Sequence, residues 1–199
     1  MTNVLRIIGF GLALGFSGTA FAQTDTPAEP ETPAVEAPAE DVPSGPQPGD
    51  TFVGATFSDW ELRCLRLENG SDRCQMYQLL RDGTGTSVAE VSIFAIPPGG
   101  PAEAGASVIT PLETLLTADL RVSVDGDKAR VYPYSFCTAD GCVARLGFTP
   151  EEITSFKRGV AATVTLVPAL APDQTVDLTM SLSGFTAAYE DLRTRSGLN

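Results

Sequence analysis

The chain has 199 residues, with 25 Asp and Glu against 13 Lys and Arg, which gives a formal net charge of −12. A field of that sign repels phosphate-rich polymers, so we expect no nucleic-acid partner. The sequence contains no histidine, which excludes Ser-His-Asp and Cys-His nucleophiles, imidazole general bases and histidine-containing zinc sites.

Residues 1–22 have the features of a secretory signal peptide. Arg6 precedes an apolar stretch, and Ala20 and Ala22 fit the small-x-small rule of signal peptidase. The apolar run is shorter than the roughly 20 residues that cross a bilayer. We therefore expect cleavage between Ala22 and Gln23, no stable membrane span afterwards, and a periplasmic or secreted location.

Residues 23–50 are rich in Pro, Ala, Glu and Thr and include seven acidic residues and no basic one. Ordering such a segment costs conformational entropy and buries almost no apolar surface, so we expect a disordered, acidic linker. Residues 51–199 retain 18 acidic and 12 basic residues, a net charge of −6. That stretch is long enough to form one domain with its own core.

The four cysteines occur as two local pairs, Cys64 with Cys74 and Cys137 with Cys142. An even number in an exported chain indicates disulfides, for which three pairings are possible. We favour the two local ones because an Asn-Gly and an Asp-Gly turn signal lie within the pairs, so that each disulfide would join the ends of a hairpin. A four-cysteine zinc site or a redox centre would need CxxC spacings that are missing here.

Apolar and polar residues alternate with period two in at least seven short segments, which indicates half-buried strands. These segments are residues 60–64, 74–76, 91–93, 120–124, 132–136, 164–166 and 176–182. Asp125-Gly126 predicts a hairpin after the fourth segment. Pro133 predicts an edge position or a bulge because it has no N–H for a ladder.

Two short helices are also predicted. The first has Thr149 as N-cap, Pro150 at its first position, Glu152 at its third, and Gly159 just beyond its end. The second follows Gly184 and has aromatic and aliphatic residues at helical spacing. Many short strands with two short helices predict a mainly β fold, formed as a single β-sandwich or flattened barrel.

Two acidic pairs have alternative interpretations. Asp125 and Asp127 could offer oxygen ligands to calcium, but the other acidic ligands of such a loop are missing, and we interpret them as a solvated hairpin tip. Glu151 and Glu152 are adjacent on a helix and point about 100° apart, which favours a capping role over a catalytic pair. We expect no catalytic residue, no metal site and no cofactor.

The region around the first cysteine pair holds the remaining candidates. Trp60 is the only tryptophan, and we interpret it as a core or edge residue rather than a ligand platform. Arg63, Arg66 and Arg73 could form a basic spot for an anionic partner. Pairing with nearby acidic residues is the favoured interpretation.

The order of these features resembles the invasion-associated locus B family over residues 57–192. Residues 57–64 (FSDWELRC) are similar to the opening motif of the family, with Cys74 as the partner of Cys64. Asp125-Gly126 is similar to the central hairpin, residues 137–144 to the second cysteine loop, and residues 156–159 and 182–185 to the closing elements. The resemblance implies an exported protein and carries over no catalytic residues.

These observations predict a non-enzymatic binding or envelope-support module whose partner is an envelope or extracellular macromolecule. The alternative is a cell-wall or glycan hydrolase that uses carboxylates alone. Such an enzyme needs two carboxylates that face each other across a cleft at about 5 Å or about 6.5–9.5 Å, and no pair can be nominated from the sequence.

Overall fold

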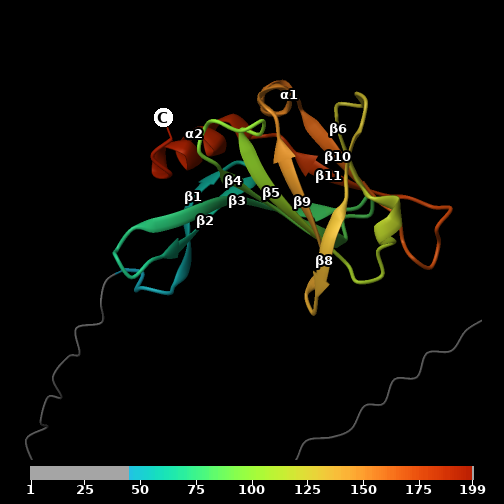
Figure 1. The fold of residues 1–199 in the computed structure, drawn as a ribbon, viewed down its shortest axis with the longest axis horizontal. Coiled ribbons are helices and arrows are strands. Elements are labelled where there is room, and N and C mark those ends of the chain that lie inside the picture. Colours follow the sequence, from blue (N-terminus) through green and yellow to red (C-terminus); the bar gives the residue numbers. More distant parts are fainter. Residues whose placement is uncertain (1–44, 199) are drawn as a thin grey trace, which may run out of the picture. The chain divides into compact units, whose positions relative to one another are not determined.

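The computed structural model describes residues 45–198 (Figure 1). The domain is mainly β with two short helices, which confirms the predicted fold class. Its strands are β1 (Thr51–Phe57), β2 (Trp60–Arg66), β3 (Asp72–Arg81), β4 (Ser87–Ala95), β5 (Ala104–Thr110), β6 (Leu120–Val124), β7 (Arg130–Tyr132), β8 (Tyr134–Thr138), β9 (Gly141–Phe148), β10 (Ala161–Leu166) and β11 (Val176–Ser181). Its helices are α1 (Pro150–Arg158) and α2 (Phe185–Arg195), with one turn of 3-10 helix at Leu116–Ala118.

The predicted signal peptide, its cleavage site between Ala22 and Gln23, and most of the predicted linker lie outside the described residues. Residues 45–50, the last part of that linker segment, are hydrogen-bonded to the domain. The main-chain N–H of Gly49 donates to the carbonyl of Arg66 at 2.9 Å, and the N–H of Arg66 donates to the carbonyl of Asp50 at 3.0 Å. The main chain of β2 thus orders the residues that lead into β1.

All the strands belong to one 11-stranded antiparallel sheet, in the order β7-β6-β10-β11-β3-β4-β5-β9-β8, with β2 joined to β3 and β1 to β2. The two ends of this order, β7 and β8, are consecutive in the chain and separated only by Pro133. The sheet therefore curls until its ends meet, as in a flattened barrel. Tyr132 of β7 packs edge-on against Phe148 of β9, with 6.1 Å between the ring centroids.

Pro133 marks the point where the chain changes its pairing partner. The sequence predicts one strand over residues 132–136, but the structure divides it in two. Tyr132 pairs with Leu120 of β6, whereas Tyr134 pairs with Ala144 of β9. The division falls at proline because that residue cannot donate to either ladder.

Strand β3 also changes partner along one edge. It pairs with β2 over Asp72–Tyr77 and then with β11 at Arg81. Between these two stretches lies the buried side chain of Gln78. Its amide nitrogen donates to the carbonyls of Asp59 at 3.2 Å and Ser181 at 3.1 Å, and its oxygen accepts from the N–H of Ser181 at 2.7 Å. The side chain thus replaces the ladder bonds that are missing at this point.

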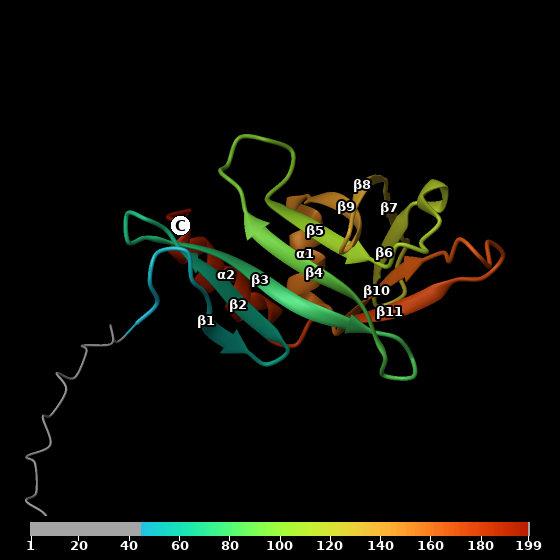
Figure 2. The ribbon, with the colours of Figure 1, turned by 90° about the horizontal axis from the view of Figure 1, so that it is seen from below.

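The core lies between the sheet and the two helices, which cover one face of the sheet (Figure 2). Phe185 of α2 packs edge-on against Trp60, with 5.6 Å between ring centroids, and stacks on Tyr189 at 5.9 Å. Phe156 of α1 packs against Phe185 at 5.4 Å and joins the two helices. Trp60 is fully buried, and its indole N–H donates to the Ser181 carbonyl at 2.9 Å, as expected for a core residue.

Helix α1 begins as predicted. The N–H of Glu152 donates to the Thr149 hydroxyl at 3.4 Å, and the N–H of Thr149 donates to the Glu152 carboxylate at 2.8 Å, which completes a capping box. Gly159 ends the helix with φ −75°, outside the left-handed region. Glycine is needed there for space, because a Cβ would lie 2.6 Å from a methyl group of Val124.

Candidate ligand-binding cleft

The sheet has one face that no helix covers, called the open face below (Figure 2). On this face the register places Tyr77, Ser92, Ser107 and Arg145 side by side on β3, β4, β5 and β9. The alternate residues of the same strands point toward the helices and are buried. Strict alternation of this kind is typical of a sheet that has one face in the core and one in solvent.

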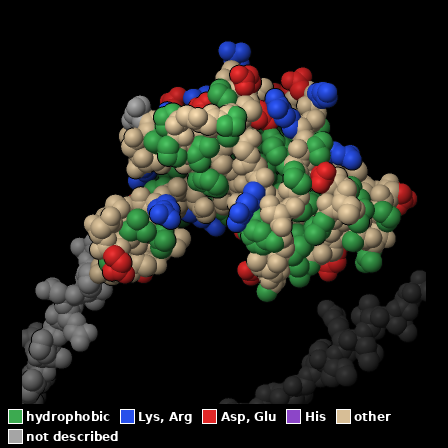
Figure 3. Space-filling view, in the orientation of Figure 1, with side chains coloured by type: hydrophobic (Ala, Val, Ile, Leu, Met, Phe, Trp, Pro, Cys, Tyr) green, Lys and Arg blue, Asp and Glu red, His purple; other side chains and the backbone are tan. Residues whose placement is uncertain are grey.

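The open face carries large apolar side chains that are well exposed to solvent. These are Leu65, Leu79, Phe94 and Phe136, which are 37%, 40%, 39% and 43% exposed. Figure 3 shows a hollow between two projecting lobes on this side of the domain, with Lys or Arg side chains along it. Exposed apolar groups gathered on one face are typical of an interaction surface.

Arginines accompany these apolar groups. Arg73, Arg81 and Arg145 make no ion pair within residues 45–198. The guanidinium of Arg145 lies 5.1 Å from the ring centroid of Phe136, and that of Arg63 lies 3.2 Å from the ring centroid of Tyr77. Stacked guanidinium groups keep their N–H donors available for a planar anion while their flat faces rest on a ring.

A cleft of about 1040 Å³, which we call the hairpin cleft, lies between the β2–β3 hairpin, the end of β4 and the C-terminal end of α2. Its charged lining residues are Arg63, Arg73, Arg195 and Asp72. The single carboxylate already pairs with Arg66, at 2.5 Å from Nε to Oδ1. Arg63 and Arg195 also have acidic partners, Glu61 and Asp191, so Arg73 is the lining arginine that makes no ion pair within residues 45–198.

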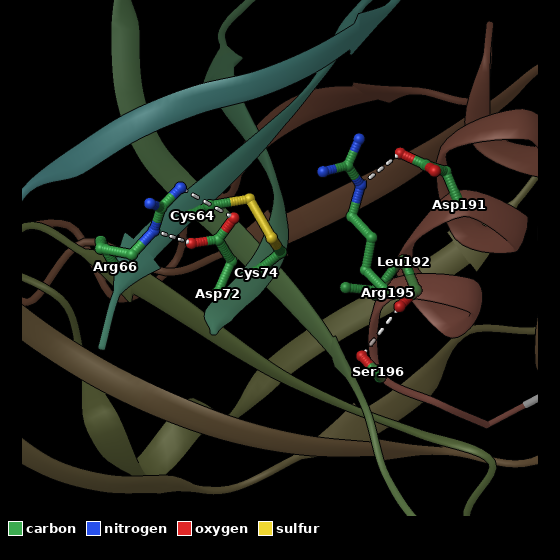
Figure 4. Close-up of a disulfide and its surroundings, with 8 residues drawn as sticks. All are labelled: Cys64, Arg66, Asp72, Cys74, Asp191, Leu192, Arg195 and Ser196. Atoms are coloured by element: carbon green, nitrogen blue, oxygen red, sulfur yellow. Dashed lines mark hydrogen bonds and ion pairs between the residues drawn. A yellow bond between two sulfur atoms is a disulfide. The ribbon is translucent and has the colours of Figure 1, made fainter. Parts of the chain in front are cut away.

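Figure 4 shows the Cys64–Cys74 disulfide with the Arg66–Asp72 pair on one side and residues of α2 on the other. Cys64 and Cys74 are directly opposite each other on β2 and β3 and are joined as predicted. Helix α2 brings Arg195 to this disulfide from the far end of the chain, and Asp191 fixes that arginine at 2.8 Å. Gly54 of β1 makes room, since a Cβ there would lie 2.8 Å from the sulfur of Cys64.

The second predicted disulfide joins Cys137 of β8 to Cys142 of β9. It closes a hairpin whose turn contains Gly141 with φ +149°. A Cβ at Gly141 would lie 2.4 Å from the carbonyl oxygen of Thr110, so this position requires glycine. All four cysteines are thus used in disulfides, and none is free to act as a thiol in the described domain.

Carboxylates on the open face are held by neighbouring side chains. A hollow of about 510 Å³ beside Gln78 is lined by Asp59 and Glu61. Ser181 donates its hydroxyl to Asp59 at 2.6 Å, and Arg63 pairs with Glu61 at 2.9 Å. Each of these two carboxylates therefore accepts a hydrogen bond from a neighbouring side chain.

Burial raises the pKa of several tyrosine hydroxyls in this domain. Burial, with a hydrogen bond to Glu90 as the next cause, raises the pKa of Tyr77. Burial also raises the pKa of Tyr132, whose hydroxyl donates to Glu152. The buried hydroxyl of Tyr134 meets no hydrogen-bond geometry within residues 45–198, and burial raises the pKa of this group more than the nearby Thr110 side chain lowers it.

One residue of each acidic pair named from the sequence has a structural role, and for Asp125 this replaces the predicted solvated tip. The carboxylate of Asp125 accepts the N–H groups of Val160 at 3.1 Å and Ala161 at 3.0 Å, which ties the β6–β7 hairpin to the end of α1. Glu152 completes the capping box and pairs with Arg130 at 3.3 Å. Within residues 45–198 no group of three or more His, Cys, Asp or Glu side chains is arranged to hold a metal.

The arginines named from the sequence divide into two kinds. Arg63 and Arg66 pair with acidic residues, which was the favoured interpretation, whereas Arg73 makes no ion pair in the described domain and lines the hairpin cleft. Sequence reasoning missed Phe94 and Arg195, which complete the cleft. Neither has a local signal, because each reaches the site through strand pairing or helix packing.

None of the described helices is long and apolar enough to cross a membrane.

Comparisons with known proteins agree with this fold. Residues 60–193 match the family model of the invasion associated locus B (IalB) protein. Two curated relatives, the invasion protein B homologs of Brucella abortus strain 2308 and of B. abortus biovar 1 strain 9-941, are each 25% identical over 146 residues, which is 73% of this chain and 82% of theirs. The crystal structure of invasion associated protein B from Bartonella henselae superposes with a TM-score of 0.60 at 20% identity, covering 72% of this chain and 96% of that one. The chain therefore belongs to the invasion associated locus B family.

Proposed function

We propose that this protein is an exported, periplasmic binding protein without enzymatic activity, and that its open face holds an anionic envelope or extracellular macromolecule. One observation carries the proposal. Three arginines that make no ion pair within residues 45–198 and four exposed apolar side chains lie on the one sheet face that the helices leave uncovered, in a chain of net charge −12. Such a face combines attraction for an anion with apolar area that a partner can bury.

Export is supported by the two disulfides and by the leader that the sequence predicts. Disulfides persist in oxidising compartments such as the bacterial periplasm. Together they tie the two hairpins at Cys64–Cys74 and Cys137–Cys142, whose strands carry open-face residues. A binding surface benefits from such stiffening, because less conformational freedom is then lost on association.

A retention experiment tests the proposal. The chain from Gln23 onward, with both disulfides formed, would be immobilised and exposed to envelope extract of the source bacterium. We expect an anionic component to be retained, and to be released by salt because screening weakens attraction between exposed charges. Replacing Arg73 and Arg145 by Glu reverses two charges on the open face and should abolish that retention.

The matched control replaces Lys128 and Arg158 by Glu. This variant has the same net charge, but the altered residues lie beside α1 and not on the open face. The control should retain the component as the parent chain does. Equal retention by all three proteins, or retention that salt does not weaken, would contradict the proposal.

The predicted location is tested by cell fractionation, in which the protein recovered from the periplasm should begin at Gln23.

A further inference from the structure

We infer that the hairpin cleft and the ring of Phe94 beside it form a binding site for an acidic polysaccharide, with sugar rings against Phe94 and their carboxylate or phosphate groups against the arginines. This inference rests on the proposed function and names the chemical class of the partner. The class follows from three features of the site: a flat exposed ring, a bare strip of backbone next to it, and a basic lining.

The flat ring is produced by a glycine on the neighbouring strand. Phe94 of β4 is opposite Gly105 of β5, and a Cβ on Gly105 would lie only 2.2 Å from Cε2 of the phenyl ring. The ring therefore lies over Gly105, in the space that a side chain would fill, and the residue is 39% exposed. An aromatic ring held in this way offers a broad apolar face, which suits the C–H face of a pyranose.

The bare strip of backbone lies one strand further across the sheet, on β9. Gly105 is opposite Gly147 of β9, which also lacks a side chain. A Cβ on Gly147 would meet only Ala102, at 3.3 Å, so the sheet surface is open there. Arg145 is two residues away along β9, about 7 Å at the usual rise of a strand. A ring that lies beside Phe94 over this strip has a guanidinium within reach of its acidic substituent.

The basic lining is on the other side of Phe94. Arg73 lines the hairpin cleft together with this ring and makes no ion pair within residues 45–198, whereas Arg63 pairs with Glu61 and Arg195 with Asp191. Guanidinium groups bind carboxylates and phosphates through two parallel hydrogen bonds. The cleft volume of about 1040 Å³ is at the upper end of the roughly 300–1,000 Å³ that is usual for ligand sites, so it has room for more than one sugar ring.

One other class of acidic polymer fits the site less well. An acidic polypeptide such as poly-glutamate satisfies the arginines but has no ring whose C–H face could lie against the exposed face of Phe94. The ring therefore distinguishes the polysaccharide from a polymer that binds by charge alone.

Affinity electrophoresis through gels that contain defined polymers tests the inference on the chain from Gln23 onward. The probes are polygalacturonate for carboxylates, phosphomannan for phosphates, neutral dextran, and poly-glutamate as an acidic polypeptide. We expect retardation by at least one of the two acidic polysaccharides, no retardation by dextran, and about tenfold weaker binding to poly-glutamate.

Three variants identify the site. Phe94→Ala and Arg73→Gln should each weaken binding of the acidic polysaccharide by about tenfold. Arg158→Gln, on the last turn of α1, removes the same charge elsewhere and should leave it unchanged. Arg73 is exposed and makes no ion pair in the described domain, so its variant keeps the test informative if Phe94→Ala does not fold.

Two results would overturn the inference. One is equal binding of poly-glutamate with no effect of Phe94→Ala, which would indicate attraction by charge alone. The other is no binding of any acidic polysaccharide. In either case the proposed function still stands if retention from envelope extract depends on Arg73 and Arg145. If that dependence is also missing, the proposed function fails as well.

Discussion

Replacing Gln78 by Met should destabilise the domain by about 2 kcal/mol. The substitution keeps the length of the side chain but removes its hydrogen bonds to Asp59 and Ser181. At about 1 kcal/mol each, these bonds contribute about 3 kcal/mol, and the greater apolar burial of Met offsets about 1 kcal/mol. The N–H of Ser181 is left without its partner at the point where β2 gives way to β11.

Urea unfolding of the chain from Gln23 onward, followed by the fluorescence of the single tryptophan, measures this loss. Trp60 is a suitable probe because its indole donates to the same Ser181 carbonyl. Gln75→Met is the matched control, since Gln75 is exposed on the same strand, and it should change the free energy of unfolding by less than about 0.5 kcal/mol. If Gln78→Met is as stable as this control, the reasoning about the strand junction is refuted.

Three further predictions concern local features. Replacing Cys64 and Cys74 together by Ala should lower the free energy of unfolding by about 2–3 kcal/mol, as expected for a short disulfide loop, and an unchanged midpoint of urea unfolding would contradict this. Thr149→Ala removes one half of the capping box and should cost about 1 kcal/mol, whereas Thr154→Ala, later in the same helix, should cost less. Burial raises the pKa of all four tyrosines. Their contribution to stability is therefore complete below about pH 10 and is lost as the pH rises further. Urea unfolding at about pH 8 and about pH 11 should show this loss, with a smaller loss in Tyr132→Phe, and equal stability at both pH values would contradict it.

The local features of the fold could be predicted from the sequence because each depends on neighbours in the chain. Thr149 and Glu152 are three residues apart, so their capping box forms wherever that helix begins. The two disulfides join residues 10 and 5 positions apart across a turn, a pairing that the turn signals favoured. Period-two alternation likewise indicated strands at short range.

Tertiary structure decided the partners of those elements and therefore the candidate site. The sequence predicts an edge position or a bulge at Pro133, and the structure adds that this residue separates two strands, β7 and β8, at opposite ends of the sheet order. Arg195 reaches the disulfide of Cys64 only because α2 packs across β2 and β3. The ring of Phe94 lies over the backbone of β5 only because the register places Phe94 opposite Gly105. The sequence by itself determined both helices and most of the strands, since propensity, capping and turn chemistry act over a few residues. Its period-two segments did not include β1, β5 and β9. Sheet order, register and helix packing are set by the burial of the whole core, and they alone bring these distant side chains to one cleft.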